Sequence, residues 1–190
     1  MINTPNVLSL FRILLVPLIM VVLFTKPKFI GQEWIGLGLF LLASVTDFLD
    51  GFLARRRKQI TRLGQILDPA ADKILTSAAF ISLVELNPRV VPAWIVAAII
   101  AREFAVTSLR SFAASEGRVI PAAGWGKLKT SLQIVTISLL IIYNELGEFR
   151  HLAPISLWVT AAVTVWSGID YFLRFGRQLL RGEGPPVVRS

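Results

Sequence analysis

Four of the five aspartates in the chain are concentrated between Asp47 and Asp72. Asp47 and Asp50 are three residues apart, so on a helix they share one face. Asp68 and Asp72 are four residues apart and share a face in the same way. Four carboxylates at one site repel one another unless cations neutralise them. Carboxylate oxygens suit hard divalent cations, so the set predicts a site for Mg²⁺ or Mn²⁺, with two ions about 3.5–4 Å apart for displacement at phosphorus.

The residues around these aspartates are small or basic. Gly51, Ala54 and Gly64 carry little bulk, which lets a large ligand approach the backbone closely. Arg55 adds a guanidinium group, which suits a phosphate. The segment therefore predicts a phosphate-bearing ligand beside the metal ions.

Two other interpretations apply to parts of this pattern. Asp68 precedes Pro69 and could cap the start of a helix. Asp47 and Asp50 could instead form ion pairs with the arginines of Arg55–Arg57. We favour the metal site because neither alternative accounts for the four aspartates and their small neighbours together.

The elements that must hold these residues are too apolar for an ordinary soluble domain. The chain is 54% hydrophobic and 17% charged, with a mean hydropathy of +0.66. Six apolar runs approach the roughly 20 residues that a helix needs to cross a bilayer. They predict an all-α integral membrane protein with six transmembrane helices in a single domain, residues 1–181, and the glycines and prolines that follow predict a disordered tail over residues 182–190. The apolar runs are Val7–Phe24, Trp34–Leu53, Ile66–Leu86, Val91–Ala113, Leu132–Tyr143 and Pro154–Phe175.

Basic residues predict the orientation of these helices. On a six-helix topology, sixteen of the twenty basic residues fall on the side of the two termini. The remaining four, Lys26, Lys28, Arg89 and Arg150, fall on the other side. The positive-inside rule then places both termini, and the loops after the second and fourth helices, in the cytoplasm. A net charge of +8 could suggest nucleic acid as a partner, but membrane topology and anionic lipid headgroups explain it more simply, so no nucleic-acid partner is expected.

The spacing of the aspartate segment matches a known pattern. It runs Asp47-x-x-Asp50-Gly51-x-x-Ala54-Arg55, then eight residues, then Gly64-x-x-x-Asp68-x-x-x-Asp72. At every fixed position it resembles the signature of the CDP-alcohol phosphatidyltransferases. The runs Ala101–Glu103 and Gly126–Thr130 look most like the phosphatidylglycerophosphate synthase branch of that family.

The resemblance implies a fold, a reaction and a set of site residues. Members of the family transfer a phosphatidyl group from CDP-diacylglycerol to an alcohol and release CMP, within a six-helix membrane fold that is often dimeric. By resemblance, Asp47, Asp50 and Asp68 hold metal ions, and Asp72 is a metal neighbour and the catalytic base. The residues implied for the nucleotide site are Gly51, Ala54, Arg55, Thr61 and Gly64. The active site of this multi-pass cell-membrane protein is expected at the cytoplasmic face, in contact with membrane lipids, with a homodimer as the expected assembly.

The acceptor alcohol has to be inferred from residues outside the aspartate motif. Five basic residues near the cytoplasmic ends of the fourth and fifth helices suit a dianionic acceptor such as glycerol 3-phosphate: Arg102, Arg110, Arg118, Lys127 and Lys129. Each could also be a simple topology marker. Inositol phosphate carries a similar charge, and serine or phosphatidylglycerol also serve as acceptors, so the preference for glycerol 3-phosphate rests on the resemblance.

A cation-coupled transporter is the main alternative to an enzyme, because transporters also place carboxylates in helical bundles. Transport sites are expected near the middle of the membrane between repeated halves. The aspartates instead border a basic segment, and the second half of the chain does not mirror the first. An enzyme is therefore the favoured prediction.

Overall fold

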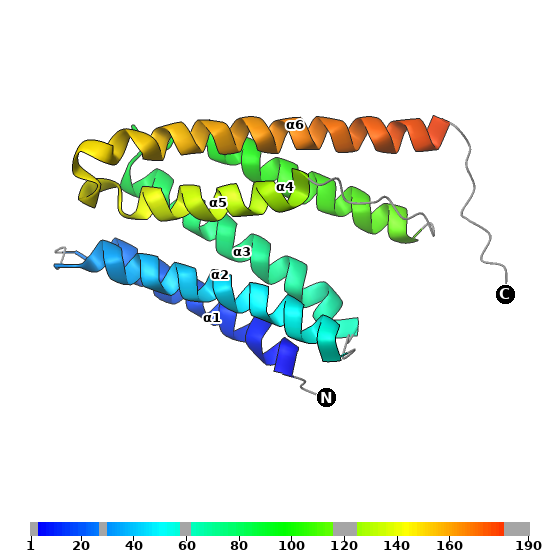
Figure 1. Cartoon of the computed structure of the whole chain (residues 1–190), viewed down its shortest axis with the longest axis horizontal. Helices are drawn as coiled ribbons and strands as arrows, with labels where there is room; N and C mark the ends of the chain where they lie inside the picture. Colours follow the sequence, from blue (N-terminus) through cyan, green and yellow to red (C-terminus); the bar gives the residue numbers. More distant parts are fainter. Residues whose placement is uncertain (1–3, 27–29, 58–61, 116–124, 181–190) are drawn as a thin grey trace.

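The computed structural model describes residues 4–26, 30–57, 62–115 and 125–180, and within them it leaves aside the side chains of 4–9, 47–57, 62–69, 125–127 and 178–180. These ranges form six α-helices and two short 3-10 helices and contain no strand, which confirms the all-α prediction (Figure 1). The α-helices are α1 (Thr4–Phe24), α2 (Gln32–Arg57), α3 (Arg62–Leu86), α4 (Ala93–Ser115), α5 (Trp125–Ile141) and α6 (Leu152–Leu180). The 3-10 helices η1 (Tyr143–Glu145) and η2 (Gly147–His151) connect α5 to α6.

Several helices extend beyond the apolar runs that predicted them. Helix α2 continues to Arg57, four residues beyond the predicted run that ends at Leu53, and α3 begins at Arg62, four residues before the predicted run that starts at Ile66. Helix α5 begins at Trp125, seven residues before the predicted run at Leu132. An apolar run marks only the part of a helix that suits hydrocarbon, whereas arginine, leucine and glutamine continue a helix equally well in a polar environment.

The connection from α1 to α2 is fixed by Gly31 and Gln32. Gly31 has a φ of 81°, a left-handed conformation that glycine adopts without steric cost. The next residue, Gln32, is only 2% exposed. Its Nε2 donates to the carbonyl oxygens of Val22 at 2.6 Å, Leu23 at 3.2 Å and Thr25 at 3.2 Å. Gln32 therefore caps the last carbonyls of α1 and holds the start of α2 against them.

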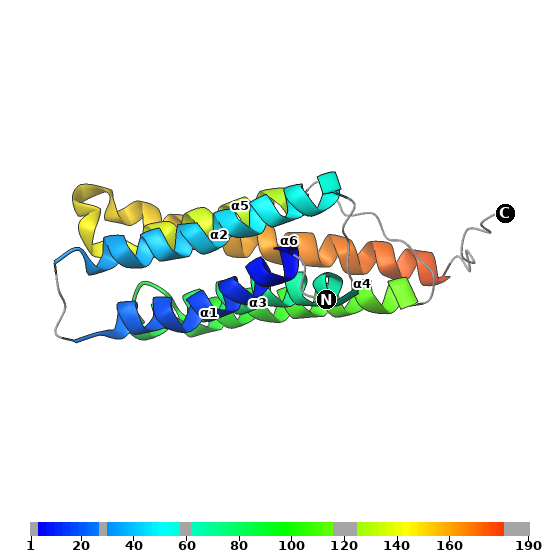
Figure 2. The same cartoon turned by 90° about the horizontal axis from the view of Figure 1, so that it is seen from below.

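The helices form two groups of three. Helix α1 packs most extensively on α3 and α2, and α6 packs most extensively on α5 and α4. Fewer contacts join the groups, through α2 with α5 and through α3 with α4 and α5. The end of α2, the start of α3, the end of α4 and the start of α5 all lie toward one end of the molecule (Figures 1 and 2). This end, called the motif end below, brings the helices of the aspartate motif and the basic segments of α4 and α5 to the same side.

Helix α6 is polar toward the protein and apolar toward the outside. Its inward positions follow a helical spacing and include four hydroxyl side chains: Ala153, Leu157, Thr160, Thr164, Ser167 and Tyr171. Its exposed positions carry large apolar groups, such as Trp166 at 64% and Leu173 at 55% exposure. In water this distribution would expose a large apolar surface, whereas in a bilayer small and hydroxyl residues suit helix interfaces and apolar groups suit lipid. The outer surface of α6 therefore has the apolar character expected of a helix that faces lipid.

Two tryptophans lie at the end of the molecule opposite the motif end. Trp94 is the second residue of α4 and Trp158 lies in the second turn of α6, with ring centroids 5.5 Å apart and planes at 66°. Both are more than half exposed, at 63% and 54%. Exposed tryptophans near helix ends are typical of the membrane–water interface, and the exposure and position of this pair fit that pattern.

The last helical stretch of the chain best satisfies the length and hydropathy that a membrane-spanning helix requires. Among the described residues, Gly147–Arg177 is the one stretch both long and apolar enough to cross a bilayer by itself. Shorter apolar stretches are Leu10–Phe24, Gln32–Thr46 and Leu128–Ile141. Helix α1 begins and α6 ends toward the motif end, an arrangement that suits two termini on one side (Figure 1). Six membrane crossings with cytoplasmic termini remain a prediction.

Candidate active site

The backbone of α2 and α3 carries the aspartate motif to the motif end. Asp47 and Asp50 lie in the second half of α2, and Asp68 and Asp72 in the first half of α3, two helices that contact each other. Asp47, Asp50 and Asp68 are among the residues whose side chains are left aside, as are the predicted nucleotide-site residues Gly51, Ala54, Arg55 and Gly64. Thr61 lies outside the described residues altogether. The convergence of the four carboxylates therefore remains a prediction.

Asp72 is the motif aspartate whose surroundings are described. Its side chain is half-buried on α3, and its carbonyl oxygen accepts a hydrogen bond of 3.0 Å from the hydroxyl of Thr76 one turn later. Among the described side chains, no group of three histidines, aspartates or glutamates could hold a metal ion, and three of the four predicted ligands fall outside that set. The donor set itself fits a hard cation, since it consists of carboxylate oxygens in a chain without cysteine.

A buried polar cluster joins α4, α5 and α6, and we call its five residues the polar seam: Arg102, Glu103, Lys129, Gln133 and Ser167. Oε1 of Glu103 forms an ion pair with Lys129 of α5 and accepts a hydrogen bond of 3.2 Å from Nε2 of Gln133. The same oxygen lies 3.4 Å from a terminal guanidinium nitrogen of Arg102. The other terminal nitrogen of Arg102 donates to Oγ of Ser167 on α6 at 2.8 Å.

The polar seam is buried, so its charges depend on one another. Glu103 and Lys129 are each 8% exposed. Charges removed from water cost several kcal/mol each unless partners compensate them, and removing one partner typically costs about 3–5 kcal/mol. Two cations of the seam share one carboxylate, and Lys73 of α3 also interacts electrostatically with Lys129. Within the seam itself, two cations, Arg102 and Lys129, therefore face the one carboxylate of Glu103.

A glycine on α6 makes room for the seam. A Cβ atom at Gly168 would lie 2.8 Å from Cγ of Arg102, closer than carbon atoms approach one another in proteins. The absence of a side chain at this position therefore lets Arg102 lie flat against α6 and reach Ser167.

Three of the five predicted acceptor residues have described side chains. Arg102 and Lys129 meet in the polar seam. Arg110 lies two turns further along α4, toward the motif end, with its guanidinium carbon 5.8 Å from the ring centre of Tyr171 on α6. The side chain of Lys127, in the first turn of α5, is not described, and Arg118 lies outside the described residues.

Some residues of this region had no predicted role. Glu103, Gln133 and Ser167 complete the polar seam; Glu103 belongs to the run Ala101–Glu103 of the family resemblance, and Gln133 and Ser167 lie outside every predicted motif. Glu103 could have been identified as a charged residue within an apolar helix, which is a functional candidate by default. Arg12 of α1 also had no predicted role in the site. It is fully buried, and its helix packs extensively against α3, which carries Asp68 and Asp72.

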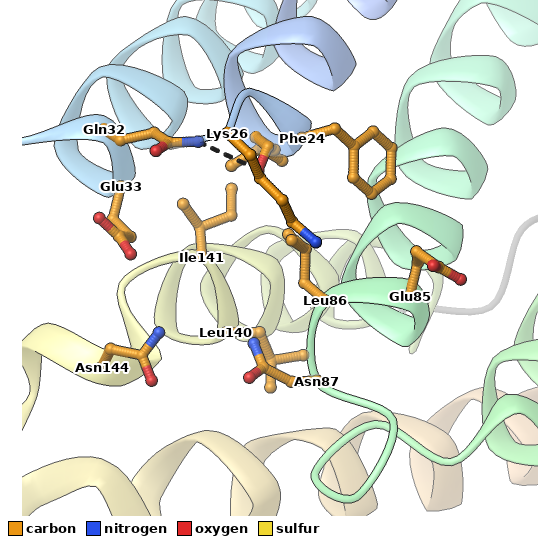
Figure 3. A pocket seen from close by; sticks show the side chains of 11 residues that line it. Phe24, Lys26, Gln32, Glu33, Glu85, Leu86, Asn87, Leu140, Ile141 and Asn144 are labelled. Carbon is orange, nitrogen blue, oxygen red and sulfur yellow. Dashed lines mark hydrogen bonds between the residues drawn. The ribbon is translucent and has the colours of Figure 1, made fainter. Parts of the chain in front are cut away.

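A separate cavity of about 320 Å³ lies at the end of the molecule opposite the motif end. It is lined by the ends of α1, α3 and α5 and by the start of α2. In Figure 3, Lys26 extends between the carboxylates of Glu33 and Glu85, which lie on opposite sides of the cavity. This cavity holds none of the aspartates of the motif, so we do not assign the reaction to it.

Comparison with known proteins is consistent with the aspartate spacing. Residues 2–166 match the family model described as CDP-alcohol phosphatidyltransferase. Three similar proteins are each named CDP-diacylglycerol–glycerol-3-phosphate 3-phosphatidyltransferase. The Bacillus subtilis protein is 43% identical over 185 residues, which cover 90% of this chain and 94% of that protein. The Haemophilus influenzae protein is 37% identical, covering 89% and 91%, and the Rickettsia typhi protein is 36% identical, covering 90% and 95%. The chain therefore belongs to the CDP-alcohol phosphatidyltransferase family and is a phosphatidyltransferase of phospholipid synthesis.

Proposed function

We propose that the enzyme transfers the phosphatidyl group of CDP-diacylglycerol to sn-glycerol 3-phosphate, giving phosphatidylglycerophosphate and CMP. The observation that carries this choice is that relatives covering about nine-tenths of the chain bear the name of this reaction. Membership of a transferase family also favours an enzyme over a cation-coupled transporter.

The donor substrate is assigned to α2 and α3. Gly51, Ala54 and Gly64 leave space for the nucleotide, and Arg55 offers a charge to its phosphates. Thr61 is a further candidate there. Asp72 takes the proton from the attacking hydroxyl of the acceptor. The new bond joins that oxygen to the phosphorus of the phosphatidyl group, and the bond from this phosphorus to the CMP oxygen breaks.

A divalent metal pair belongs to this proposal. Asp47, Asp50, Asp68 and Asp72 would hold Mg²⁺ or Mn²⁺, because four carboxylates require positive charge to lie at one site. When bound, the ions would withdraw negative charge from the pyrophosphate that is cleaved.

The acceptor phosphate is assigned to the basic residues of α4, α5 and the segment between them. The excess of positive charge around the polar seam supports a dianionic acceptor over serine or a neutral lipid alcohol. Arg110 and Lys127 are the preferred phosphate contacts, with Arg102, Arg118 and Lys129 as further candidates.

We also propose a setting for the reaction. The protein crosses the cell membrane several times, with the motif end at the cytoplasmic face, where CDP-diacylglycerol enters from surrounding lipid. A homodimer is the proposed assembly. The apolar outer surface of α6 supports the membrane setting.

The test is CMP release by purified protein with CDP-diacylglycerol and a panel of alcohols: glycerol 3-phosphate, inositol phosphate, serine and phosphatidylglycerol. We expect turnover with glycerol 3-phosphate, its loss in excess EDTA, and its recovery with Mg²⁺ or Mn²⁺. Turnover with another alcohol alone would overturn the acceptor assignment and leave the family unchanged. Full turnover in excess EDTA would overturn the metal site.

A further inference from the structure

Glu103 is the anion at the centre of the polar seam. Three groups from two helices contact its Oε1: the ammonium of Lys129, the amide of Gln133 and the guanidinium of Arg102. Neither the resemblance nor the proposed mechanism gives this residue a role. A carboxylate that is 8% exposed in an apolar helix is costly, so a charged group at this position is a candidate for a functional role.

The contacts of Glu103 join two helices whose backbones scarcely meet. Helices α4 and α5 both pack on α6 and on α3, but they are not among the helix pairs with extensive contact to each other. The described link between them is made by side chains, from Glu103 to Lys129 and Gln133. Arg102 extends the link to Ser167 of α6. Glu103 thus makes the described side-chain link between α4 and α5.

This link bears directly on the proposed acceptor site. Arg110 lies seven residues after Glu103 on α4, and Lys127 lies two residues before Lys129 on α5. The two preferred phosphate contacts therefore stand on the two helices that Glu103 joins. Lysine has a long flexible side chain, and an ion pair in a buried site removes most of that freedom before a ligand binds.

We propose that Glu103 is a positioning residue for the acceptor: its carboxylate fixes Lys129 and ties α4 to α5, so that the cations of both helices are held in place for the acceptor phosphate. The inference rests on the proposed use of glycerol 3-phosphate. Glu103 itself contacts no substrate, because an acceptor phosphate and a carboxylate repel each other.

The first experiment compares Glu103→Gln with Glu103→Asp. Glutamine keeps the size and a hydrogen-bond acceptor but removes the charge, whereas aspartate keeps the charge. For Glu103→Gln we expect KM for glycerol 3-phosphate to rise about tenfold, with KM for CDP-diacylglycerol within about twofold of the wild type. Glu103→Asp should restore most of the acceptor affinity.

The matched control is Asp170→Asn on α6. Asp170 pairs with Arg174 at 3.0 Å, but these side chains are 29% and 50% exposed, so the pair is a surface pair. This variant removes one carboxylate from an ion pair outside the polar seam and should leave both KM values unchanged.

The second experiment separates positioning from folding through Lys129. Glu103→Gln should lower the thermal unfolding midpoint, because two buried cations lose their partner. Adding Lys129→Met removes one of those cations and should raise the midpoint again. The acceptor KM of the double variant should equal that of Lys129→Met alone, since Glu103 acts through Lys129 and the two effects are not additive.

Several outcomes overturn the inference alone: an equal rise in both KM values, an unchanged acceptor KM in Lys129→Met, or additive effects in the double variant. If Glu103→Gln does not fold, the comparison of the double variant with Lys129→Met decides. A wild-type enzyme that ignores glycerol 3-phosphate would overturn the proposed function, and this inference with it.

Discussion

Asp72 combines two properties that a general base needs. It belongs to the predicted metal set, and its side chain is half-buried on α3, beside Lys73 and one turn before Thr76. We predict that Asp72→Asn lowers turnover about 10²–10⁴-fold, because the amide keeps the size of the carboxylate and removes its basicity. Binding of CDP-diacylglycerol, measured by equilibrium binding of a labelled analogue, should persist. Near-normal turnover would show that another group accepts the proton.

Substitution of Arg110 tests whether this basic residue near the motif end binds the acceptor substrate or only helps to set the membrane topology. Arg110→Ala should raise KM for glycerol 3-phosphate about tenfold, in line with the 1.5–3 kcal/mol of roughly one charge-assisted contact, and change KM for CDP-diacylglycerol little. Steady-state kinetics with each substrate varied in turn measures both constants.

Arg174→Ala is the control for Arg110→Ala. Arg174 is also basic and lies in the last third of α6, but it pairs with Asp170 on the same helix. Its removal should leave both constants unchanged. Equal effects of the two variants on the acceptor KM would mean that Arg110 contributes only to the general field of the protein.

Single residues differ in how well the sequence predicts them. The four motif aspartates are found by spacing alone, because their partners lie three or four residues away on the same helix. The polar seam is not found this way, since Gln133 meets Glu103 across 30 residues and Arg102 meets Ser167 across 65. Such pairs depend on how α4, α5 and α6 are rotated in the fold, and no local pattern encodes that rotation.

Helix α6 offers a test of packing between elements. A Cβ at Gly168 would press on Cγ of Arg102 at 2.8 Å, whereas a Cβ at Gly176 would have no neighbour within 4 Å. We predict that Gly168→Ala lowers the free energy of unfolding by about 1–3 kcal/mol through overpacking. Gly176→Ala should raise it by up to about 1 kcal/mol, because alanine is the better helix former.

Thermal unfolding in detergent micelles, followed by far-UV circular dichroism, compares the two variants. The same substitution on the same helix is expected to act in opposite directions, so a general effect of alanine in α6 cannot explain the result. If both variants were stabilised, Arg102 would have room to move away from α6, and the seam would not be tightly packed there.

The apolar runs predict helix ends better at the end of the molecule opposite the motif end than at the motif end itself. Phe24 and Leu86 end α1 and α3 in agreement with the apolar runs, because each run is followed within three residues by a proline. At the motif end, α2, α3 and α5 extend through polar sequence without such a stop. Hydrophobicity reports the lipid environment, so it cannot locate the end of a helix that leaves the lipid.

The orientation of the whole molecule can be tested by labelling, because the chain contains no cysteine. Ile30 is fully exposed, next to the start of α2, and Ser115 is exposed at the end of α4. In right-side-out vesicles, an impermeant maleimide should label Ile30→Cys at once, and Ser115→Cys only after the membrane is opened. Ile30 is preferable to Gly31, whose φ of 81° would strain a cysteine.

The cysteine-free wild type provides the background for this experiment. Immediate labelling of both variants from the outside would contradict an arrangement in which the motif end faces the cytoplasm. Labelling of Ser115→Cys alone would indicate the reverse orientation.

The two groups of helices suggest a division of labour within one small chain. Helices α1, α2 and α3 contain the aspartate motif, whereas α4, α5 and α6 contain the polar seam and Arg110, and contacts within each group exceed those between them. On the proposed function, the first group binds and activates CDP-diacylglycerol, the donor that all members of the family share. The second group binds the acceptor alcohol, which differs from one member to another. New acceptor specificities could then evolve through substitutions in the second half of the gene, while the helices that activate the nucleotide stay unchanged.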